Sequence, residues 1–435
     1  MKFLTIIRTF VAFLFCGVAF GQSLPQQIPD STLIVRKIEI FGNEHTKEQI
    51  IRREMSITVG SVLTAEAVEH DLQRIYSLGL FNRVELDSVV DGKHVDLSVV
   101  VHERWYVFPF PILGIKYRNP KNLYYGGGLT HQNFRGWNEK LWFAFALGFD
   151  RWVQLGYQNP KLTADDDLFL RAFVRYGRIR SLSVTDELYD QTQLSIQLTI
   201  GKRFGLYHWL MGWMNYDIWQ VSEARLGRTV SPTGRDAYLT TGVRLVLDTR
   251  DLQEYSTRGS YATVTASKFG LGESDVDFFK MGYDFRKYVS LMGDLTLGAR
   301  TFGMFSGGGI IPPYRHEYFG YDERIRGYFT TVFQGENIMG NSLELRFPIL
   351  KPRYYTFPYS WLPEFSVWRY GLYVGLFVDA GRIWDRHEPL SMRGWKSGIG
   401  GGIHFLLPYS LVARTEYAVN KEGRGEFYID FGVSF

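Results

Sequence analysis

An Arg-Gly-aromatic sequence is the first feature of this chain that could do chemistry. Residues 322–328 read Asp-Glu-Arg-Ile-Arg-Gly-Tyr and lie in a long connection, about residues 303–335, between strand-like segments. Connections of this length are usually functional or disordered, and the Tyr, Phe and Arg content of this one is not typical of disorder. An enclosed guanidinium needs a carboxylate, which it can bind through two hydrogen bonds. Arg326 is therefore the first candidate site residue.

The other chemical candidates are weak. Asp165-Asp166-Asp167 could suggest a cation site, but it lacks a pattern of ligands and is typical of a solvated turn. The nine histidines have no metal-ligand spacing, and Gly307-Gly308-Gly309 lacks the strand and helix context of a phosphate-binding loop. We find no nucleophile placed with a base. We therefore predict no enzyme activity, no cofactor and no metal site.

Composition favours a β protein with two kinds of surface. Of the 435 residues, 16% are aromatic, 22% are charged and 45 are glycine, and the mean hydropathy is −0.14. These values argue against a helical membrane protein. They suit strands that show aromatic side chains to one solvent and polar groups to another. The net charge of +4 gives no indication of nucleic-acid binding.

The N-terminus is typical of a secretory signal peptide. Basic residues flank the start of a short apolar run over residues 10–20, and small residues follow at a suitable cleavage position. We predict a signal peptide over residues 1–21 and a linker over residues 22–31. Cys16 is the only cysteine, so the mature chain would have neither a disulfide nor a thiolate metal site. After the signal no apolar run reaches the roughly 18 residues of a membrane helix, so any membrane span must consist of strands.

Residues 32–104 predict a small α+β domain with the element order β-α-α-β-β. Thr46 predicts a capping box at the start of the first helix, and Thr64 predicts an N-cap for the second. This order, punctuated by Gly42-Asn43 and Gly79-Leu80-Phe81, resembles a polypeptide-transport-associated (POTRA) domain. The resemblance implies that the domain binds client or partner chains by adding a strand to its sheet edge. The alternative is a structural plug or spacer without a client.

From residue 105 to residue 435, short strands of alternating character are separated by turn residues. The sixteen candidate strands are 107–117, 123–133, 138–148, 151–159, 168–177, 191–204, 208–219, 237–247, 260–269, 277–287, 291–302, 336–347, 371–380, 397–406, 410–419 and 426–435. An even number agrees with bacterial barrels that begin and end on the same side of the membrane. We predict a mainly β protein, with a sixteen-stranded transmembrane antiparallel β-barrel after the small domain.

The last candidate strand shows the alternation most clearly. The residues expected to point outward are Phe427, Ile429, Phe431, Val433 and Phe435. Such an apolar face would be an aggregation hazard in water, but it is the normal exterior of a barrel in lipid. A soluble β-sandwich is therefore the poorer interpretation.

A second aromatic-rich stretch covers residues 348–370. With the small domain in the periplasm, this stretch and the turn over residues 248–259 fall on the periplasmic side. The stretch is long for a periplasmic turn, and we interpret it as an interfacial aromatic segment. A partner-docking element is the less favoured alternative.

These features together resemble the BamA/TamA-type superfamily of outer-membrane assembly and secretion barrels. The resemblance covers the mature chain and depends on the order of its short motifs. They are residues 325–328 in the long connection, Phe377-Val378-Asp379-Ala380-Gly381 on the thirteenth strand, the 248–259 turn and the aromatic C-terminus. The chain departs from the family's best-known assembly barrels, which carry several POTRA domains, because it has room for one.

The resemblance implies a latch inside the barrel. In the family, the long loop folds into the lumen and its arginine meets the Phe-x-Asp-x-Gly strand. The implied latch residues are Arg326, Gly327, Tyr328, Glu344, Phe377, Asp379 and Gly381. Asp379 would pair with Arg326, Glu344 is a possible second acceptor, and Gly327 would permit a tight backbone. The alternative is a solvated Arg326 in a surface loop.

The first and last strands predict a weak lateral seam. Pro109 and Pro111, with Gly114 after them, fall in the first strand, and proline is confined to sheet edges or strand starts. Phe431 and Phe435 would line the other side of the seam. A weak seam could admit client strands or open sideways into lipid. Alternatively, both prolines precede the paired segment and only end the connector.

From these features we expect insertion or translocation of other polypeptides at the bacterial outer membrane. The expected partners are unfolded or nascent outer-membrane or secreted polypeptides, outer-membrane lipid and accessory periplasmic proteins. A dedicated secretion pore for one client and a passive porin or structural barrel are the alternatives. The small domain argues against the passive barrel.

Overall fold

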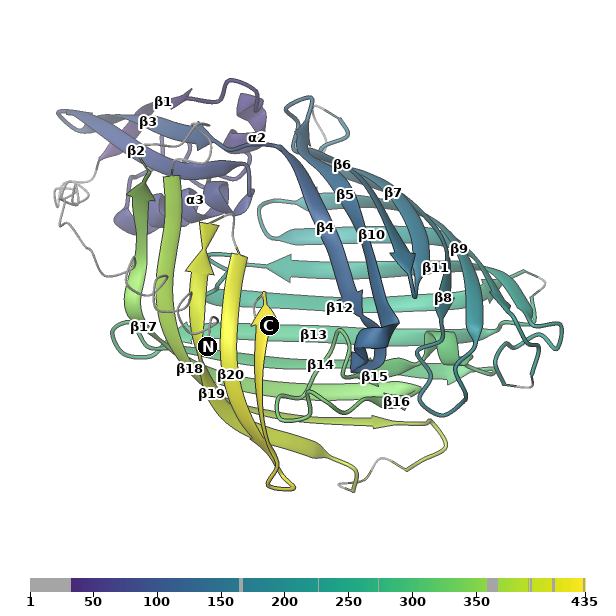
Figure 1. Cartoon of the computed structure of the whole chain (residues 1–435). Coiled ribbons are helices and arrows are strands. Elements are labelled where there is room, and N and C mark those ends of the chain that lie inside the picture. Colours follow the sequence, from purple (N-terminus) through teal and green to yellow (C-terminus); the bar gives the residue numbers. More distant parts are fainter. Residues whose placement is uncertain are drawn as a thin grey trace.

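The computed structural model describes residues 33–163, 167–225, 227–272, 274–357, 367–389, 391, 393–408, 411–432 and 435. The predicted signal peptide, the linker, Asp165 and Asp166 lie outside these residues. A small α+β domain is followed by one sixteen-stranded antiparallel sheet that curves into a barrel shape (Figure 1). The predicted fold class is confirmed, although the sheet is not closed.

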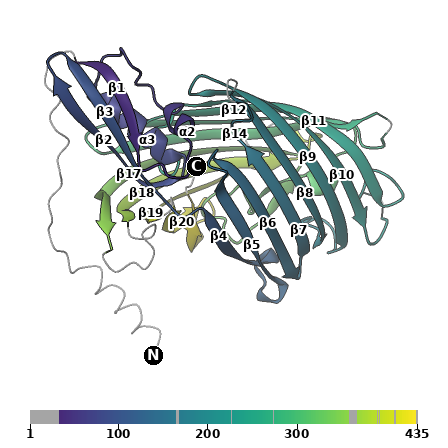
Figure 2. The ribbon, with the colours of Figure 1, turned by 90° about the horizontal axis from the view of Figure 1, so that it is seen from above.

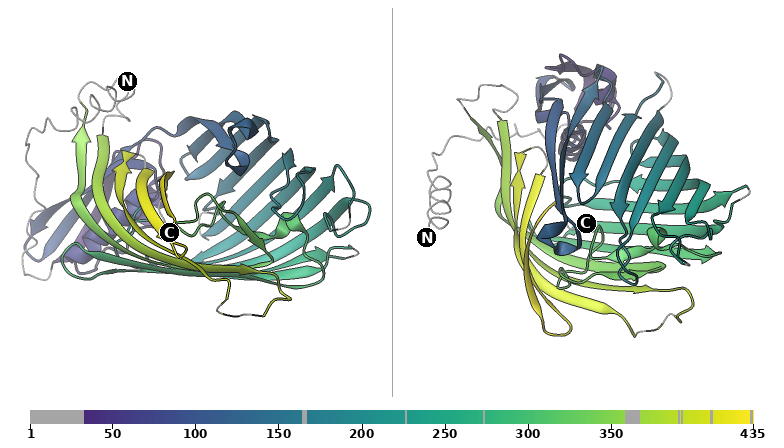
Figure 3. Two further views of the ribbon diagram at one scale, coloured as in Figure 1. Left: turned by 60° about the horizontal axis from the view of Figure 1, so that its bottom comes forward. Right: turned by 45° about the vertical axis from the view of Figure 1, so that its right-hand side comes forward.

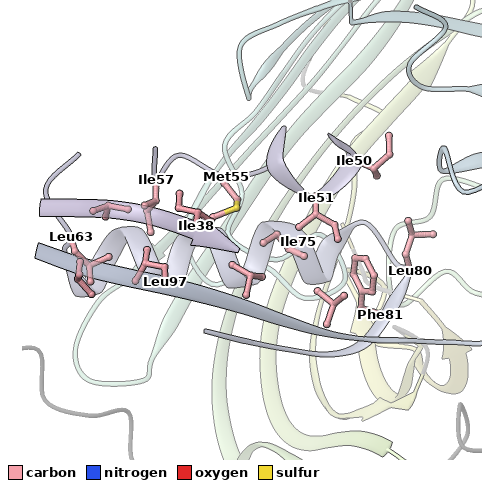
Figure 4. Packing of buried hydrophobic residues seen from close by; sticks show 14 of the residues in the cluster. Ile38, Ile50, Ile51, Met55, Ile57, Leu63, Ile75, Leu80, Phe81 and Leu97 are labelled. Atoms are coloured by element: carbon pink, nitrogen blue, oxygen red, sulfur yellow. The ribbon is translucent and has the colours of Figure 1, made fainter. Parts of the chain in front are cut away.

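The small domain has the predicted element order. Its elements are β1 (Ile34–Phe41), α2 (Glu48–Arg52), α3 (Ala65–Ser77), β2 (Phe81–Asp91) and β3 (His94–Glu103). Strand β3 lies in the centre of the sheet, parallel to β1 and antiparallel to β2. Ile38, Ile51, Ile75 and Leu97 lie in one apolar core between the helices and the sheet (Figure 4). The Thr64 hydroxyl accepts a hydrogen bond of 3.1 Å from the Ala67 N–H, which confirms the predicted N-cap.

The predicted capping box at Thr46 is wrong. Helix α2 begins after Lys47 and has no side-chain cap. The buried Thr46 hydroxyl instead lies 3.0 Å from the Tyr106 hydroxyl and accepts a hydrogen bond of 2.9 Å from the Asn133 side chain. Tyr106 and Asn133 belong to the barrel part of the chain. A local sequence pattern does not predict that such distant residues bind the Thr46 hydroxyl in place of the helix N-terminus.

The barrel strands follow one another around the sheet in chain order (Figures 1 and 2). They are β4 (Val107–Ile115), β5 (Leu123–Phe134), β6 (Glu139–Gly148), β7 (Arg151–Asn159), β8 (Leu168–Arg180), β9 (Asp190–Phe204), β10 (His208–Val221), β11 (Arg235–Asp248), β12 (Gly259–Leu271), β13 (Phe278–Ser290), β14 (Thr296–Gly308), β17 (Asn337–Thr356), β18 (Val367–Trp384), β19 (Lys396–Leu407), β20 (Leu411–Asn420) and β21 (Gly425–Phe431). Two short strands, β15 (Glu317–Phe319) and β16 (Phe333–Gly335), pair with each other in the connection between β14 and β17.

Side chains alternate between the two faces of this sheet. On β6, Leu141, Phe143 and Phe145 are exposed on the outer face, whereas Trp142 and Ala144 face inward and are less accessible. An outer band of apolar side chains is what a barrel in lipid requires. Among the helices of the described residues, none is long and apolar enough to cross a membrane.

Two predicted boundaries are wrong. The eleventh strand was expected over residues 291–302, but β14 covers Thr296–Gly308 because the apolar residues after β13 form a tight turn, in which Leu295 donates to the Met292 carbonyl. The 348–370 stretch was expected as a long turn. Strand β17 instead continues to Thr356 and β18 begins at Val367, so most of the stretch extends one hairpin. Bulges in the β17–β18 register near Pro348 and Leu350 mark where this extension begins.

The small domain docks on the end of the barrel beside the extended β17–β18 hairpin (Figures 1 and 2). Its main polar contact is a buried ion cluster around Glu54, which is 5% exposed. Arg203 on β9 donates two hydrogen bonds to the Glu54 carboxylate at 2.5 and 2.8 Å, and Arg74 on α3 donates another at 2.8 Å. Arg83 on β2 also lies over the Tyr354 ring of the hairpin, 6.0 Å from its centre. The domain therefore covers one mouth of the barrel.

We predict that docking weakens in acid. Burial alone would raise the pKa of the Glu54 carboxyl, but its hydrogen bonds to Arg203 and the positive charges of Arg203, Arg53 and Arg74 lower this pKa from 4.5 to about 2. Arg53 and Arg74 belong to the small domain itself, so undocking removes only the contribution of Arg203 and raises the pKa of the Glu54 carboxyl. The docking free energy is therefore fully present at neutral pH and should fall as the pH drops through the acidic range toward 2, because the undocked carboxyl takes up its proton at a higher pH than the docked one.

Docking can be measured as the distribution of distances between a spin label on α2 and a second label on the turn between β9 and β10. At neutral pH, Glu54→Gln should already broaden the distribution, because the variant leaves buried guanidiniums without a carboxylate. The control Glu66→Gln removes an exposed carboxylate on α3 and should leave the distribution unchanged. A narrow distribution for Glu54→Gln would contradict the docking role of this residue.

Candidate functional site

The connection between β14 and β17 runs inside the curved sheet, as expected for the latch (Figure 3). Its tip is buried: Ile325 and Tyr328 pack with Phe302, Phe319 and Ile338 in one apolar cluster. Arg326, between them in sequence, is 7% exposed. The alternative of a solvated surface arginine is therefore wrong.

Asp379 on β18 is the main partner of Arg326. The Arg326 Nε and Nη2 atoms each donate a hydrogen bond of 2.7 Å to the two oxygens of the Asp379 carboxylate. The Arg326 backbone N–H donates to the same carboxylate at 3.0 Å. The Arg326 Cζ atom lies 3.5 Å from the centre of the Phe377 ring. This arrangement combines a two-point ion pair with a cation–π contact, each of which gains strength away from water.

Two glutamates complete the coordination of the Arg326 guanidinium. Its Nη1 atom donates to Glu344 on β17 at 2.5 Å and to Glu416 on β20 at 3.4 Å. Glu344 and Asp379 are 1% and 3% exposed, respectively. One loop side chain therefore bonds to three different strands of the same wall.

A second layer of charges surrounds these carboxylates. Arg346 donates to Glu344 at 2.7 Å, and Arg414 donates to Glu416 at 3.1 Å. His404 lies 3.1 Å from Glu416. Three guanidiniums and three carboxylates are thus buried together, and the partnering of each charge offsets the cost of removing it from water.

Backbone geometry at the tip requires glycine. Gly327 has φ of +98°, and a Cβ atom there would lie 3.1 Å from the Asn420 amide nitrogen. The Asn420 side chain donates to the Gly327 carbonyl at 3.0 Å. On β18, a Cβ atom on Gly381 would lie 2.6 Å from the Phe319 ring. The structure therefore brings together all seven predicted latch residues, although Tyr328 bonds through its hydroxyl to Glu422 rather than to the Asp379 strand.

Strands β4 and β21 are the two edges of the sheet, and no ladder joins them within the part of the chain that the structure describes. Pro109 and Pro111 lie inside β4, opposite Leu129 and Gly127 of β5. The alternative in which both prolines precede the paired segment is therefore wrong. Gly114 also lies within β4, where a side chain would overlap the Tyr124 ring.

The backbone alternation places both prolines on the free edge. Gln132 donates to the carbonyl of Tyr106, the residue directly opposite in the β4–β5 register, so Tyr106 has its backbone groups turned toward β5. Because this orientation alternates along a strand, Phe108 and Phe110 also face β5, whereas Pro109 and Pro111 face away from it. The free edge consequently lacks two successive N–H donors.

The C-terminus turns away from the other side of the seam. Phe431 points outward and is 72% exposed, as predicted, but Phe435 is 4% exposed and the outward prediction for it is wrong. Its ring stacks on Tyr288 with centres 6.1 Å apart, and the Tyr288 hydroxyl donates to the Phe435 oxygen at 2.8 Å. Gly432, with φ of +108°, lets the chain leave the strand direction. Val433 lies outside the described residues.

Known families match both parts of the chain. A model described as the Omp85 superfamily domain matches residues 133–435, and a POTRA model, described as the surface antigen variable number repeat, matches residues 33–104. The chain belongs to the Omp85 superfamily. The expected BamA/TamA-type family with a POTRA domain is confirmed.

Individual relatives of this Omp85 protein agree. It is 24% identical over 340 residues to the outer membrane protein assembly factor BamA of Nitratidesulfovibrio vulgaris, a match that covers 72% of this chain and 42% of that protein. A BamA of Neorickettsia risticii is 38% identical over 71 residues, which are 16% of this chain and 10% of the relative. The chain thus spans less than half the length of these relatives.

Two solved structures share the fold. BamA from Haemophilus ducreyi lacking POTRA domains 1–3 has a TM-score of 0.56 and 19% identity, with 92% of this chain and 84% of that chain covered. CdiB from Escherichia coli has a TM-score of 0.57 and 10% identity, with coverage of 92% and 76%.

Sequence reasoning missed Glu416, Arg346, Arg414 and His404 in this Omp85 protein. The sequence did contain a signal for three of them. Residues two apart on a strand share one face of the sheet, and this spacing relates Arg346 to Glu344 and Arg414 to Glu416 on the predicted strands. Among the described residues, no group of three or more His, Cys, Asp or Glu side chains could hold a metal ion.

Arg326→Ala should strongly destabilise the latch, because it leaves three buried carboxylates without their shared cation. We expect the free energy of unfolding to fall by ~3–5 kcal/mol, measured by denaturant titration of the barrel in detergent. Arg324→Ala is the matched control. Arg324 is two residues away and forms a partly exposed pair with Asp430 at 3.2 Å, so its loss should cost only ~0–1 kcal/mol. Equal losses for the two variants would refute the latch.

Proposed function

We propose that this Omp85 protein inserts or translocates other polypeptides at the bacterial outer membrane, with its POTRA domain in the periplasm. The main observation behind the proposal is that the two edge strands, β4 and β21, are not hydrogen-bonded to each other, whereas the sheet between them is continuous. A free sheet edge is a template on which an extended client strand can add. Membership of the family supports this proposal.

In the POTRA domain, we propose β2 as the edge that captures clients. The other edge, β1, is partly covered, because Ser61 accepts a hydrogen bond from the Val35 N–H and Arg52 donates to the Ile38 carbonyl. Strand β2 contacts the hairpin of β17 and β18 near Arg83, but its far end is open, with Val89 69% exposed. Strand addition at that end would hold a client on the docked domain, from which it could extend toward the mouth of the barrel.

The latch favours insertion through the seam over passage through the lumen. A dedicated secretion pore would have to move the loop and so break the contacts of Arg326 with three strands. Insertion at β4 and β21 leaves these contacts intact. A passive porin is disfavoured because the loop and the docked POTRA domain occupy the lumen and its mouth. We further propose outer-membrane lipid and accessory periplasmic proteins as partners, and no nucleic acid, cofactor or catalysis.

Depletion of this protein tests the proposal in the cell. Insertion activity predicts that several other outer-membrane barrels fall in abundance together, measured by quantitative proteomics of isolated outer membranes. Loss of one secreted protein alone would support the secretion pore instead. Unchanged levels of every other outer-membrane barrel and every secreted protein would contradict both the insertion function and the secretion function.

Restoring the missing donors should close the seam. In Pro109→Val/Pro111→Val the free edge of β4 regains two N–H groups, so pairing with β21 should become more favourable. We expect client insertion to slow, measured with a barrel client and proteoliposomes, while the heat resistance of the barrel rises. Leu113→Val is the control, because Leu113 lies on the same edge and already has its N–H. Unimpaired insertion by the double variant would contradict the role of the prolines.

A further inference from the structure

A cavity of about 430 Å³ lies between the POTRA domain and the inner wall of the barrel. Seven basic and three acidic side chains line it, an excess of four positive charges. The acidic groups are already engaged: Glu54 with Arg203 at 2.5 Å, Asp248 with Arg250 at 2.8 Å, and Asp251 with the Thr257 N–H at 3.0 Å. Arg53, Arg74 and Arg203 share the single charge of Glu54, so part of the excess lies in that cluster and the rest lies on basic side chains without an acidic partner.

Three of these basic side chains have no ion-pair partner in the described part of the chain: Lys140 on β6, Arg171 on β8 and Arg244 on β11. Arg171 and Arg244 are exposed to the barrel interior. The alternative is that water in the barrel interior solvates both guanidiniums, in which case nothing would hold their side chains in one geometry. The contacts of both arginines argue against this alternative.

Each arginine rests against a tryptophan that lies over a glycine. The Arg171 Cζ atom is 5.4 Å from the centre of the Trp142 ring, and Trp142 faces Gly156 on the neighbouring strand β7. Arg244 is 5.8 Å from Trp213, which faces Gly242. A Cβ atom on either glycine would overlap the indole. The glycines thus let each indole lie flat on the wall, where it can position a guanidinium.

A third contact between an arginine and a tryptophan occurs on the same wall. The Arg175 Cζ atom is 5.0 Å from the centre of the Trp152 ring. Trp152 also faces a glycine, Gly177, although a Cβ atom there would meet the Trp152 Cβ atom rather than the indole. Stacking holds a guanidinium by its face and leaves its N–H donors available for a carboxylate. The repetition indicates a built surface, and positioned donors bind with less loss of side-chain entropy.

The spacing of the cations selects the kind of ligand. Neighbouring strands lie about 4.8 Å apart, so the backbones of β6 and β8 are separated by roughly 10 Å and those of β8 and β11 by roughly 14 Å. Around the wall, Lys140 on β6 and Arg244 on β11 are thus separated by roughly 24 Å, which is too far for one small anion to contact all three cations. An extended polypeptide rises about 3.3 Å per residue, so carboxylates about three to four residues apart would match the spacing.

We propose that Lys140, Arg171 and Arg244 form a binding surface for an extended acidic segment of a client polypeptide at the periplasmic entrance of the barrel. This inference rests on the proposed function and names the client chemistry that the entrance selects. The surface lies between the docked POTRA domain and the lumen, so a segment bound there has passed the domain and reached the barrel.

Peptide binding to the full chain in lipid nanodiscs tests the proposal. The probe is a fluorescent peptide with glutamate at about every third position, and its matched control carries glutamine instead. We expect the glutamate peptide to bind more tightly, with an affinity that falls as NaCl rises from about 50 to about 300 mM. The triple variant Lys140→Gln/Arg171→Gln/Arg244→Gln should weaken binding about tenfold or more.

Two variants separate charge from folding. Arg151→Gln removes one positive charge from the outer face of β7, outside the cavity, and should leave binding unchanged. Arg171→Lys/Arg244→Lys keeps both charges and should retain most of the affinity. Equal binding by the triple variant, or equal binding of the glutamine peptide, would overturn the proposal. Binding of vesicles with phosphate-rich lipid headgroups in place of the peptide would overturn the choice of polypeptide.

The outcomes also distinguish this proposal from the proposed function. If depletion lowers other barrels while the triple variant binds the peptide normally and restores barrel levels, the acidic-segment surface is wrong and the assembly function stands. If depletion changes nothing while the peptide binds as expected, the assembly function is wrong and the surface remains.

Discussion

The structure depends on a buried arginine that bonds to three strands at once. Arg326 is carried by a loop, yet its guanidinium meets carboxylates from β17, β18 and β20. These carboxylates would repel one another without it, and Arg346 and Arg414 balance the remaining charge. Because breaking a buried pair is far more costly than breaking an exposed one, the C-terminal wall and the loop form a single unit.

The seam beside this wall is built in the contrary way. Its strand β4 carries two prolines where an incoming β21 would need N–H donors, and Phe435, beyond the end of β21, is buried against Tyr288. Trp105 adds a further obstacle, since its indole N–H donates to the Val107 carbonyl on the free edge. The wall is thus held by ions and the seam is left unpaired. Such a division would let the β4 edge move while Arg326 keeps its contacts with the C-terminal wall.

Much of this architecture could be predicted from the sequence, because strand alternation and turn residues are local signals. The latch could also be predicted, since Arg326 and Asp379 lie in short motifs with a recognisable order. The failures have two physical causes. The strand after Ser290 was placed too early because a tight turn of apolar residues imitates a strand. Thr46 and Phe435 depend on groups far away in the chain, namely the hydroxyl of Tyr106 and the lumenal ring of Tyr288. No local pattern reports such competition.

The central claim is that the seam between β4 and β21 stays unpaired while the rest of the sheet is continuous. Spin labels at Leu113 on β4 and Ile429 on β21, in lipid nanodiscs without client, measure it directly. Labels at Leu129 and Phe143, which face each other on β5 and β6, give the reference for paired strands. We predict a broader and longer distance distribution across the seam than for the reference. A distribution as short and narrow as the reference would contradict the account.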